Sequence, residues 1–158
     1  MGYSKALRVA VSAVALLVGA NAALAQQAPT GTWANETSGQ SFYYGAMTSD
    51  GTYFYCMGGY QYGVSYSYPG YYQQCVRYDP VNNSWATMAQ MAFPAYYNAA
   101  GYYNGRVFSL AGYNPNQGYS NQIQAYTVAN NTWATLSATL SIPVYLHAAA
   151  TMTDRIYV

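Results

Sequence analysis

Short apolar runs separated by turn residues fill most of the chain after its first 40 residues. The run from Ala95 to Tyr103 is apolar and small, and Asn104-Gly105 after it is typical of a type I′ hairpin turn. Residues 106–110 predict a buried strand, and residues 122–128 alternate polar and apolar at a period of two. A turn at Asn130-Asn131 leads into a last strand at 132–136. Residues 90–139 therefore predict four short antiparallel strands.

The same plan is found on either side of this unit. Residues 41–89 predict strands at 42–49, 53–57, 75–78 and 84–88. Residues 140–158 begin another unit, and the N-terminal segment 26–40 contains Trp33, which matches the last strand of a preceding one. The turns of the 41–89 unit are expected at Asp50-Gly51 and Asn82-Asn83. The pattern predicts an all-β chain built from repeated four-stranded units.

One stretch of sequence occurs twice, 48 residues apart. Tyr78 to Thr87 has the form YDPVNNSWAT, and Tyr126 to Thr135 has the form YTVANNTWAT. Tyrosine precedes tryptophan by seven residues in both copies. A period near 50 residues is typical of repeat architectures, in which one unit cannot bury its apolar face alone.

Residues 1–25 have the pattern of a signal peptide. Lys5 and Arg8 precede an apolar stretch from Val9 to Ala20, and Ala23-Leu24-Ala25 is a small-x-small cleavage site. We expect cleavage after Ala25 and a secreted or periplasmic protein. No later apolar run is long enough to span a membrane.

The composition after the signal peptide excludes one class of partner. Three arginines, four carboxylates and no lysine remain, so nucleic acid finds no basic surface. Twenty tyrosines remain, together with abundant Asn, Gln, Ser and Gly. Such a surface suits carbohydrate, protein or self-association.

The two cysteines, Cys56 and Cys75, flank residues 57–74. An isolated pair in an exported protein usually bonds, so they form a candidate disulfide, with two buried free thiols as the alternative. Two cysteines at this spacing and a single histidine match no metal-ligand pattern, and no metal or other cofactor is expected.

The repeated features resemble the kelch family over residues 33–158. The resemblance is carried by the glycine doublet Gly58-Gly59 after an apolar strand, by Tyr78-Asp79-Pro80 and by Trp85. It recurs in the next unit at Gly112, Tyr126 and Trp133, although Ala111 stands in place of the first glycine. The resemblance implies a kelch-type β-propeller in which each four-stranded unit is one blade.

This propeller is expected to be incomplete, with about two full blades and partial blades at each end. The last unit stops at Val158, where the middle unit continues from Arg106 to Gly112. We expect an N-terminal fragment of a longer protein. The alternative is a complete short chain that assembles with copies of itself.

Tyrosines in the long loops are the candidate ligand-binding residues. In kelch-like propellers such loops lie on the face where ligands usually bind, and tyrosine mixed with Gly and Ser is typical of adaptable binding loops. The alternative is a surface loop packed on itself. The candidates are Tyr60, Tyr62, Tyr66, Tyr68, Tyr71, Tyr72, Tyr113 and Tyr119.

His147 and the aspartates have structural interpretations. Kelch repeats often carry a histidine at the position of His147 in a structural role, and Asp50, Asp79 and Asp154 lie at predicted turns. No set of catalytic residues can be assembled, so this chain itself is not expected to be an enzyme.

Three functions fit these observations. The first is a binding module with a tyrosine-rich face for glycan or protein. The second is a fragment of a carbohydrate-active kelch enzyme, of the galactose-oxidase-like or sialic-acid-mutarotase-like kind. The third is a self-associating structural protein of the cell surface.

Overall fold

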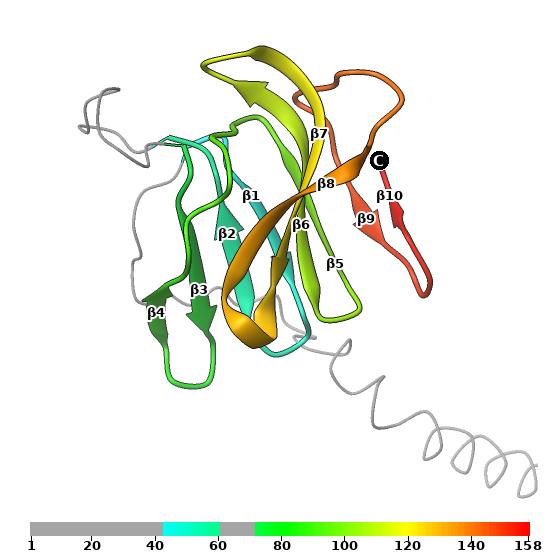
Figure 1. The fold of residues 1–158 in the computed structure, drawn as a ribbon. Coiled ribbons are helices and arrows are strands. Elements are labelled where there is room, and N and C mark those ends of the chain that lie inside the picture. The colour runs from blue at the N-terminus through cyan, green and yellow to red at the C-terminus, as the bar shows by residue number, and fades with distance from the viewer. Residues whose placement is uncertain (1–42, 61–71) are drawn as a thin grey trace, which may run out of the picture. The chain divides into compact units, whose positions relative to one another are not determined.

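The computed structural model describes residues 43–60 and 72–158. The predicted signal peptide, the segment around Trp33 and most of the loop after Tyr60 lie outside these residues. The first sheet is antiparallel with strand order β1-β2-β3-β4 (Figure 1). Its strands are β1 (Ala46–Ser49), β2 (Phe54–Met57), β3 (Cys75–Asp79) and β4 (Ser84–Thr87).

The second sheet repeats this order with longer strands. It consists of β5 (Ala99–Tyr103), β6 (Arg106–Asn114), β7 (Gly118–Thr127) and β8 (Thr132–Thr139), in the order β5-β6-β7-β8. A short 3-10 turn, η1 (Val128–Asn130), precedes β8, and the hairpin of β9 (Ala150–Thr151) and β10 (Ile156–Tyr157) follows. The prediction of an all-β fold is confirmed for the described residues. The two sheets lie within residues 41–89 and 90–139.

Residues 114–120, which separate the strand predicted at 106–110 from that at 122–128, form the tip of a long hairpin. Asn114 pairs with Gly118 and Tyr113 pairs with Tyr119, so β6 and β7 extend almost to the turn. The carboxamide of Asn114 accepts a hydrogen bond from the amide of Asn116 at 2.9 Å, and Gly118 has φ +89°. Because the Asn114 side chain accepts a hydrogen bond from an amide of the turn, the pairing of β6 with β7 extends to Asn114 and Gly118.

The core lies between the two sheets. Strands β2 and β3 supply Tyr55, Met57 and Cys75, and strands β6 and β7 supply Val107 and Tyr126, all buried. The rings of Tyr55 and Tyr126 lie 6.1 Å apart across the interface. Aromatic rings of this size bury a large apolar area, so this interface is a main source of stability.

The duplicated sequence is explained by strand register. Tyr78 lies directly opposite Trp85, and Tyr126 lies directly opposite Trp133, with ring centroids 4.9 and 5.4 Å apart. A hairpin turn separates the members of each pair, which sets the spacing of seven residues. Cross-strand aromatic pairs of this kind stabilise a sheet.

Each pair is completed by an asparagine in a left-handed conformation. The phenol of Tyr78 donates to Oδ1 of Asn83 at 3.1 Å, and that of Tyr126 donates to Oδ1 of Asn131 at 2.9 Å. The φ angles of the two asparagines are +47° and +53°. Asparagine tolerates this region better than most residues, which accounts for its recurrence.

The candidate disulfide between Cys56 and Cys75 is corrected by the structure, in which both cysteines are free. Cys56 pairs with Val76, whereas Cys75 pairs with Met57. Because successive side chains of a strand point to opposite faces, the two thiols lie on opposite faces of the sheet. Cys75 is buried in the core, where desolvation raises its pKa to about 12.

Candidate functional site

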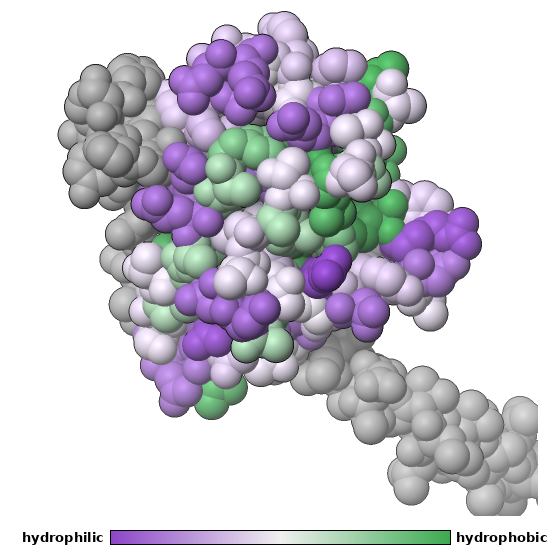
Figure 2. Space-filling view, viewed as in Figure 1, coloured by the Kyte–Doolittle hydropathy of each residue, from purple (hydrophilic) through white to green (hydrophobic). Residues whose placement is uncertain are grey.

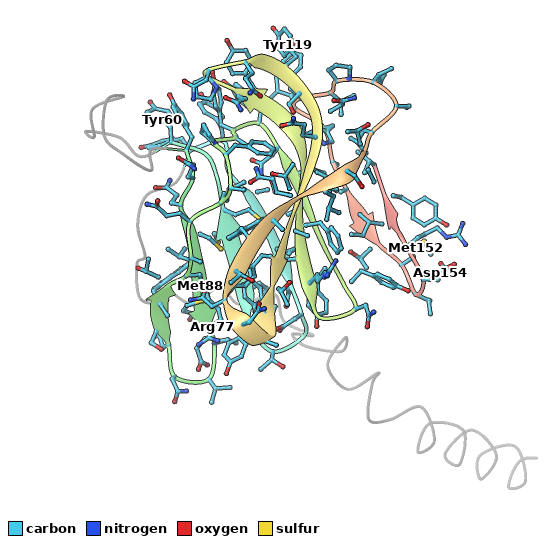
Figure 3. The ribbon with its side chains drawn as sticks, viewed as in Figure 1. Tyr60, Arg77, Met88, Tyr119, Met152 and Asp154 are labelled. Atoms are coloured by element: carbon cyan, nitrogen blue, oxygen red, sulfur yellow. The ribbon has the colours of Figure 1, made fainter. Side chains whose placement is uncertain are left out.

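The two ends of the sheets differ in chemistry. The turns of the β1-β2, β3-β4, β5-β6 and β9-β10 hairpins lie at one end (Figure 1). The other end holds the tip of the β6-β7 hairpin and the residues next to the β2-to-β3 connection. Figure 3 labels Tyr60 and Tyr119 at this second end, with Arg77 and Asp154 toward the first.

Within residues 43–60 and 72–158, nine tyrosines at the second end form one connected set of ring contacts, which we call the tyrosine cluster. The centroids of contacting rings are between 4.5 and 6.5 Å apart. The shortest separations are 4.5 Å between Tyr44 and Tyr97, and 4.7 Å between Tyr119 and Tyr145. The cluster consists of Tyr43, Tyr44, Tyr60, Tyr72, Tyr96, Tyr97, Tyr113, Tyr119 and Tyr145.

Equivalent backbone bridges position the cluster in the two sheets. Tyr43 and Tyr60 exchange two backbone hydrogen bonds of 2.8 Å. Tyr96 and Tyr113 exchange two of 3.0 and 2.8 Å. The first bridge lies beyond the paired residues of β1 and β2, and the second lies beyond the N-terminal end of β5, against β6.

A second set of hydrogen bonds joins consecutive units, and we call it the inter-unit ladder. The amide of Tyr97 donates to the carbonyl of Tyr44 at 2.7 Å, and the amide of Leu146 donates to the carbonyl of Tyr97 at 3.1 Å. The backbones of Tyr44, Tyr97 and Leu146 are left-handed, with φ of +60°, +56° and +52° in that order. Such a conformation costs about 1–2 kcal/mol for a residue with a side chain, so the surrounding contacts must hold it.

At Gly59 and Gly112 a hydrogen bond to the next unit coincides with a close approach to the backbone of the residue's own unit. Gly59 and Gly112 donate backbone hydrogen bonds of 2.9 Å to the carbonyls of Ala95 and Val144. A Cβ on Gly59 would lie 2.5 Å from the carbonyl oxygen of Tyr43, and one on Gly112 would lie 2.8 Å from that of Tyr96. The sequence therefore has glycine where one backbone crosses another.

The first position of the glycine doublet tolerates a side chain in one unit. Ala111 takes the place of Gly58 and has the same left-handed conformation, with φ of +52° against +67°. A Cβ on Gly58 itself would contact the carbonyl oxygen of Ala95 too closely. Ala111 therefore has the same backbone conformation as Gly58, although its unit lacks the glycine pair.

Part of the tyrosine cluster faces solvent. Tyr44, Tyr119 and Tyr145 are 54%, 60% and 45% exposed, whereas Tyr72 is buried beneath its stacked neighbour Tyr96. The adjacent phenol of Tyr145, by charge repulsion and by a hydrogen bond, raises the pKa of Tyr119. The Tyr119 phenol therefore stays protonated at neutral pH and can donate as well as accept hydrogen bonds.

The tyrosine end carries no charged side chain among the described residues. The charged residues lie at or near the hairpin turns of the opposite end, and several have a role there. Asp50 accepts hydrogen bonds from the amides of Thr52 and Tyr53 at 2.8 and 2.7 Å, as expected for a turn residue. The charged residues are Asp50, Arg77, Asp79, Arg106, Asp154 and Arg155.

The other aspartates also stabilise turns. Asp79 accepts from the amides of Val81 and Asn82 at 2.9 and 3.1 Å. These hydrogen bonds and that from the Asn82 side chain lower its pKa. Asp154 forms an exposed ion pair with the adjacent Arg155. The turn interpretation of the aspartates agrees with these contacts.

The predicted ligand-binding residues divide into two groups. Four of them, Tyr60, Tyr72, Tyr113 and Tyr119, belong to the tyrosine cluster. Tyr62, Tyr66, Tyr68 and Tyr71 lie outside the described residues.

Five members of the cluster were missed by sequence reasoning. Tyr43, Tyr44, Tyr96, Tyr97 and Tyr145 lie at the starts of the units, where they were assigned to strands. The signal was the doublet at 43–44, its repetition at 96–97 and the return of tyrosine at 145. Tyrosine recurring at the start of each unit marks one end of the fold.

His147 lines a cavity of about 270 Å³. Leu140, Ile142, Val144 and Val158 also line this cavity, and Figure 2 shows apolar residues gathered over this part of the molecule. Burial lowers the pKa of His147, so it is neutral at pH 7.

Two further properties concern the described residues as a whole. Within residues 43–60 and 72–158, no three His, Cys, Asp or Glu side chains are grouped to hold a metal ion. Across the same residues, no helix has the length and apolar character needed to cross a membrane.

Comparison with known proteins gives a fold and no family. No protein-family description and no curated protein matches the sequence. Among solved structures, the chain is similar to the "Structure of YjhT", with a TM-score of 0.60 and 16% sequence identity. The match covers 77% of this chain and 34% of the other, so the chain spans about a third of that protein's length. At this identity the likeness concerns the arrangement of antiparallel sheets alone.

Proposed function

We propose that the two sheets are consecutive blades of a kelch-type β-propeller. The same Tyr–Asn–Trp arrangement lies on the outer hairpin of each sheet, and the inter-unit ladder joins equivalent positions of successive units. The backbone likeness to a larger solved structure supports a fold that continues with further sheets of the same kind. In a propeller the blades pack face to face, as the two described sheets do.

The protein acts as a binding module whose ligand contacts the tyrosine cluster. The observation that carries this proposal is the gathering of nine tyrosines at an end with no charged side chain among the described residues. Exposed rings of Tyr44, Tyr119 and Tyr145 offer flat apolar faces beside phenol groups that can hydrogen-bond.

A neutral glycan suits this surface best. The C–H faces of sugars stack on aromatic rings, and their hydroxyls pair with phenols and carboxamides. The described residues of this end offer no cation to an anionic ligand and no side-chain carboxylate to a basic one. A protein is the alternative ligand, and binding assays with glycans and with proteins separate the two.

The test is binding to an array of neutral and anionic glycans, followed by calorimetry with the best ligand. Tyr44→Ala and Tyr119→Ala should each weaken binding by up to about tenfold, because an aromatic contact contributes about 0.5–1.5 kcal/mol. Tyr157→Ala is the matched control, since Tyr157 is 51% exposed and belongs to the β9-β10 hairpin.

Three outcomes would count against the glycan proposal. They are no glycan binding, equal losses in all three variants, and a preference for anionic glycans. Binding to a protein array that is lost only in the two cluster variants would identify a protein ligand instead.

Export is also part of the proposal. The basic and apolar pattern of residues 1–25 supports cleavage after Ala25. Expression in a bacterial host followed by N-terminal sequencing should give a periplasmic or medium chain that begins at Gln26. An intact chain starting at Met1 in the cytoplasm would contradict export.

A further inference from the structure

Tyr119 and Tyr145 have a relationship that ligand binding does not require. They come from different units, Tyr119 from β7 and Tyr145 from the segment before β9, yet their rings stack with centroids 4.7 Å apart and planes inclined by 29°. Both are exposed, at 60% and 45%. The neighbouring Tyr145 phenol also raises the pKa of Tyr119, as expected for two hydroxyls that lie close together. Two phenols in van der Waals contact and open to solvent can react with each other.

Tyr44 and Tyr97, the pair with the shortest separation in the cluster, are less suited to reaction. Their centroids are 4.5 Å apart, but the planes are inclined by 49° and Tyr97 is half-buried. The backbone of Tyr97 is also held on both sides by the inter-unit ladder. Tyr119 and Tyr145 are stacked and both are exposed, so within the described part of the cluster they are the pair best placed to meet an external oxidant.

The easily oxidised groups of the core do not compete for this reaction. Cys75 is buried and burial raises its pKa, so little of it is the reactive thiolate. Trp85 and Trp133 follow the β3-β4 and β7-β8 turns, at the end opposite the tyrosine cluster. A radical formed on Tyr119 or Tyr145 has other tyrosines as its nearest aromatic neighbours.

We propose that Tyr119 and Tyr145 form a site of oxidative cross-linking, at which a peroxidase with hydrogen peroxide converts the two side chains into a dityrosine. Such a bond would tie the β6-β7 hairpin of one unit to the start of the next. The cross-link would use two rings of the proposed ligand surface, but it requires an oxidant and no glycan, so it is tested independently of ligand binding.

The reaction balances as follows. Each phenol gives one electron and one proton to the peroxidase system and becomes a phenoxyl radical. The two radicals join through a carbon–carbon bond between ring positions ortho to the hydroxyls, and the two ring hydrogens at these carbons move to the phenol oxygens. Overall the protein loses two hydrogen atoms, and one hydrogen peroxide is reduced to two waters.

The experiment treats the dilute full chain with a haem peroxidase and hydrogen peroxide. Dityrosine fluorescence should appear while the chain stays monomeric on a denaturing gel. Mass spectrometry of a digest should show the peptides containing Tyr119 and Tyr145 joined, with the mass of two hydrogen atoms lost. Oxidation of exposed methionines adds oxygen instead, so it is distinguished by mass.

Tyr119→Phe and Tyr145→Phe should each abolish the joined peptides, while Tyr157→Phe leaves their yield unchanged. Phenylalanine keeps the ring, and circular dichroism checks that the variants fold. The proposal would be overturned by a yield of monomer cross-link that is unchanged in the two variants. It would be overturned equally by dityrosine formed only between chains, or by no dityrosine at all. Glycan binding by the untreated chain is measured separately and does not depend on this result.

Discussion

Replacing Gly59 by alanine should be among the most damaging single changes in the described part of the chain. Gly59 has φ +69°, so alanine there would have to adopt the left-handed conformation, at about 1–2 kcal/mol. Its Cβ would also lie 2.5 Å from Gly45 N and from the carbonyl oxygen of Tyr43. These atoms belong to the backbone and cannot rotate away. Displacing them should cost a further 1–3 kcal/mol or so, as overpacking usually does.

Gly105 provides the matched control. It has φ +75°, close to that of Gly59, but an added Cβ would meet no atom within 4 Å. Gly105→Ala should therefore show the conformational cost alone, about 1–2 kcal/mol, and Gly59→Ala should show about 2–5 kcal/mol. The difference between the variants measures the steric term.

The assay is urea unfolding followed by tryptophan fluorescence, with the free energy of unfolding taken from the midpoint and slope. The tyrosine cluster gives a second readout, because Tyr43 and Gly45 flank the displaced backbone. Gly59→Ala should weaken ligand binding more than Gly105→Ala does. Equal loss of stability in the two variants would refute the reasoning, since it would mean that the close approach seen at Gly59 carries no energetic weight.

Three further predictions concern the core and the repeated pair. Tyr126→Phe should lower the free energy of unfolding by about 1 kcal/mol, because it removes a partly buried hydrogen bond. Tyr78→Phe removes an exposed one and should cost less in the same urea assay. The free energy of unfolding should fall as pH rises from about 9 toward about 12, because the raised pKa of Cys75 keeps its thiol neutral in the folded state while the unfolded thiol ionises. The Cys75→Ala variant should show a shallower decline over the same pH series. Identical slopes for the two proteins would contradict this reasoning. Thiol titration of the unfolded, unreduced protein should find two free thiols, and a reductant should not lower the melting temperature; a Cys56–Cys75 disulfide would show that the register of β2 against β3 is wrong.

The strands were predictable because turn residues mark their ends. Asn104-Gly105 predicts a type I′ hairpin, and both residues have positive φ, at +48° and +75°. The 48-residue repeat also predicted that two units would have one plan, and the identical order of strands in the two sheets agrees with it. These features are local, so sequence alone reveals them.

The tyrosine cluster was only half predictable because its geometry is not local. Tyr97 is placed by hydrogen bonds to residues about 50 positions away in either direction, and its left-handed backbone has no sequence signal comparable to that of glycine. The disulfide prediction failed for a related reason. Spacing brought Cys56 and Cys75 to neighbouring strands, but a register offset of one residue decided which face each thiol occupies.

The inter-unit ladder has a consequence for how such a chain can grow during evolution. Tyr97 uses its amide toward the unit before it and its carbonyl toward the unit after it. A duplicated gene segment of about one repeat would bring a new unit that already carries both halves of this contact. The new unit would meet its neighbours through surfaces identical to those they present to each other, and it would add its own tyrosines to the same end. Lengthening the protein and enlarging its aromatic surface would then be a single genetic event.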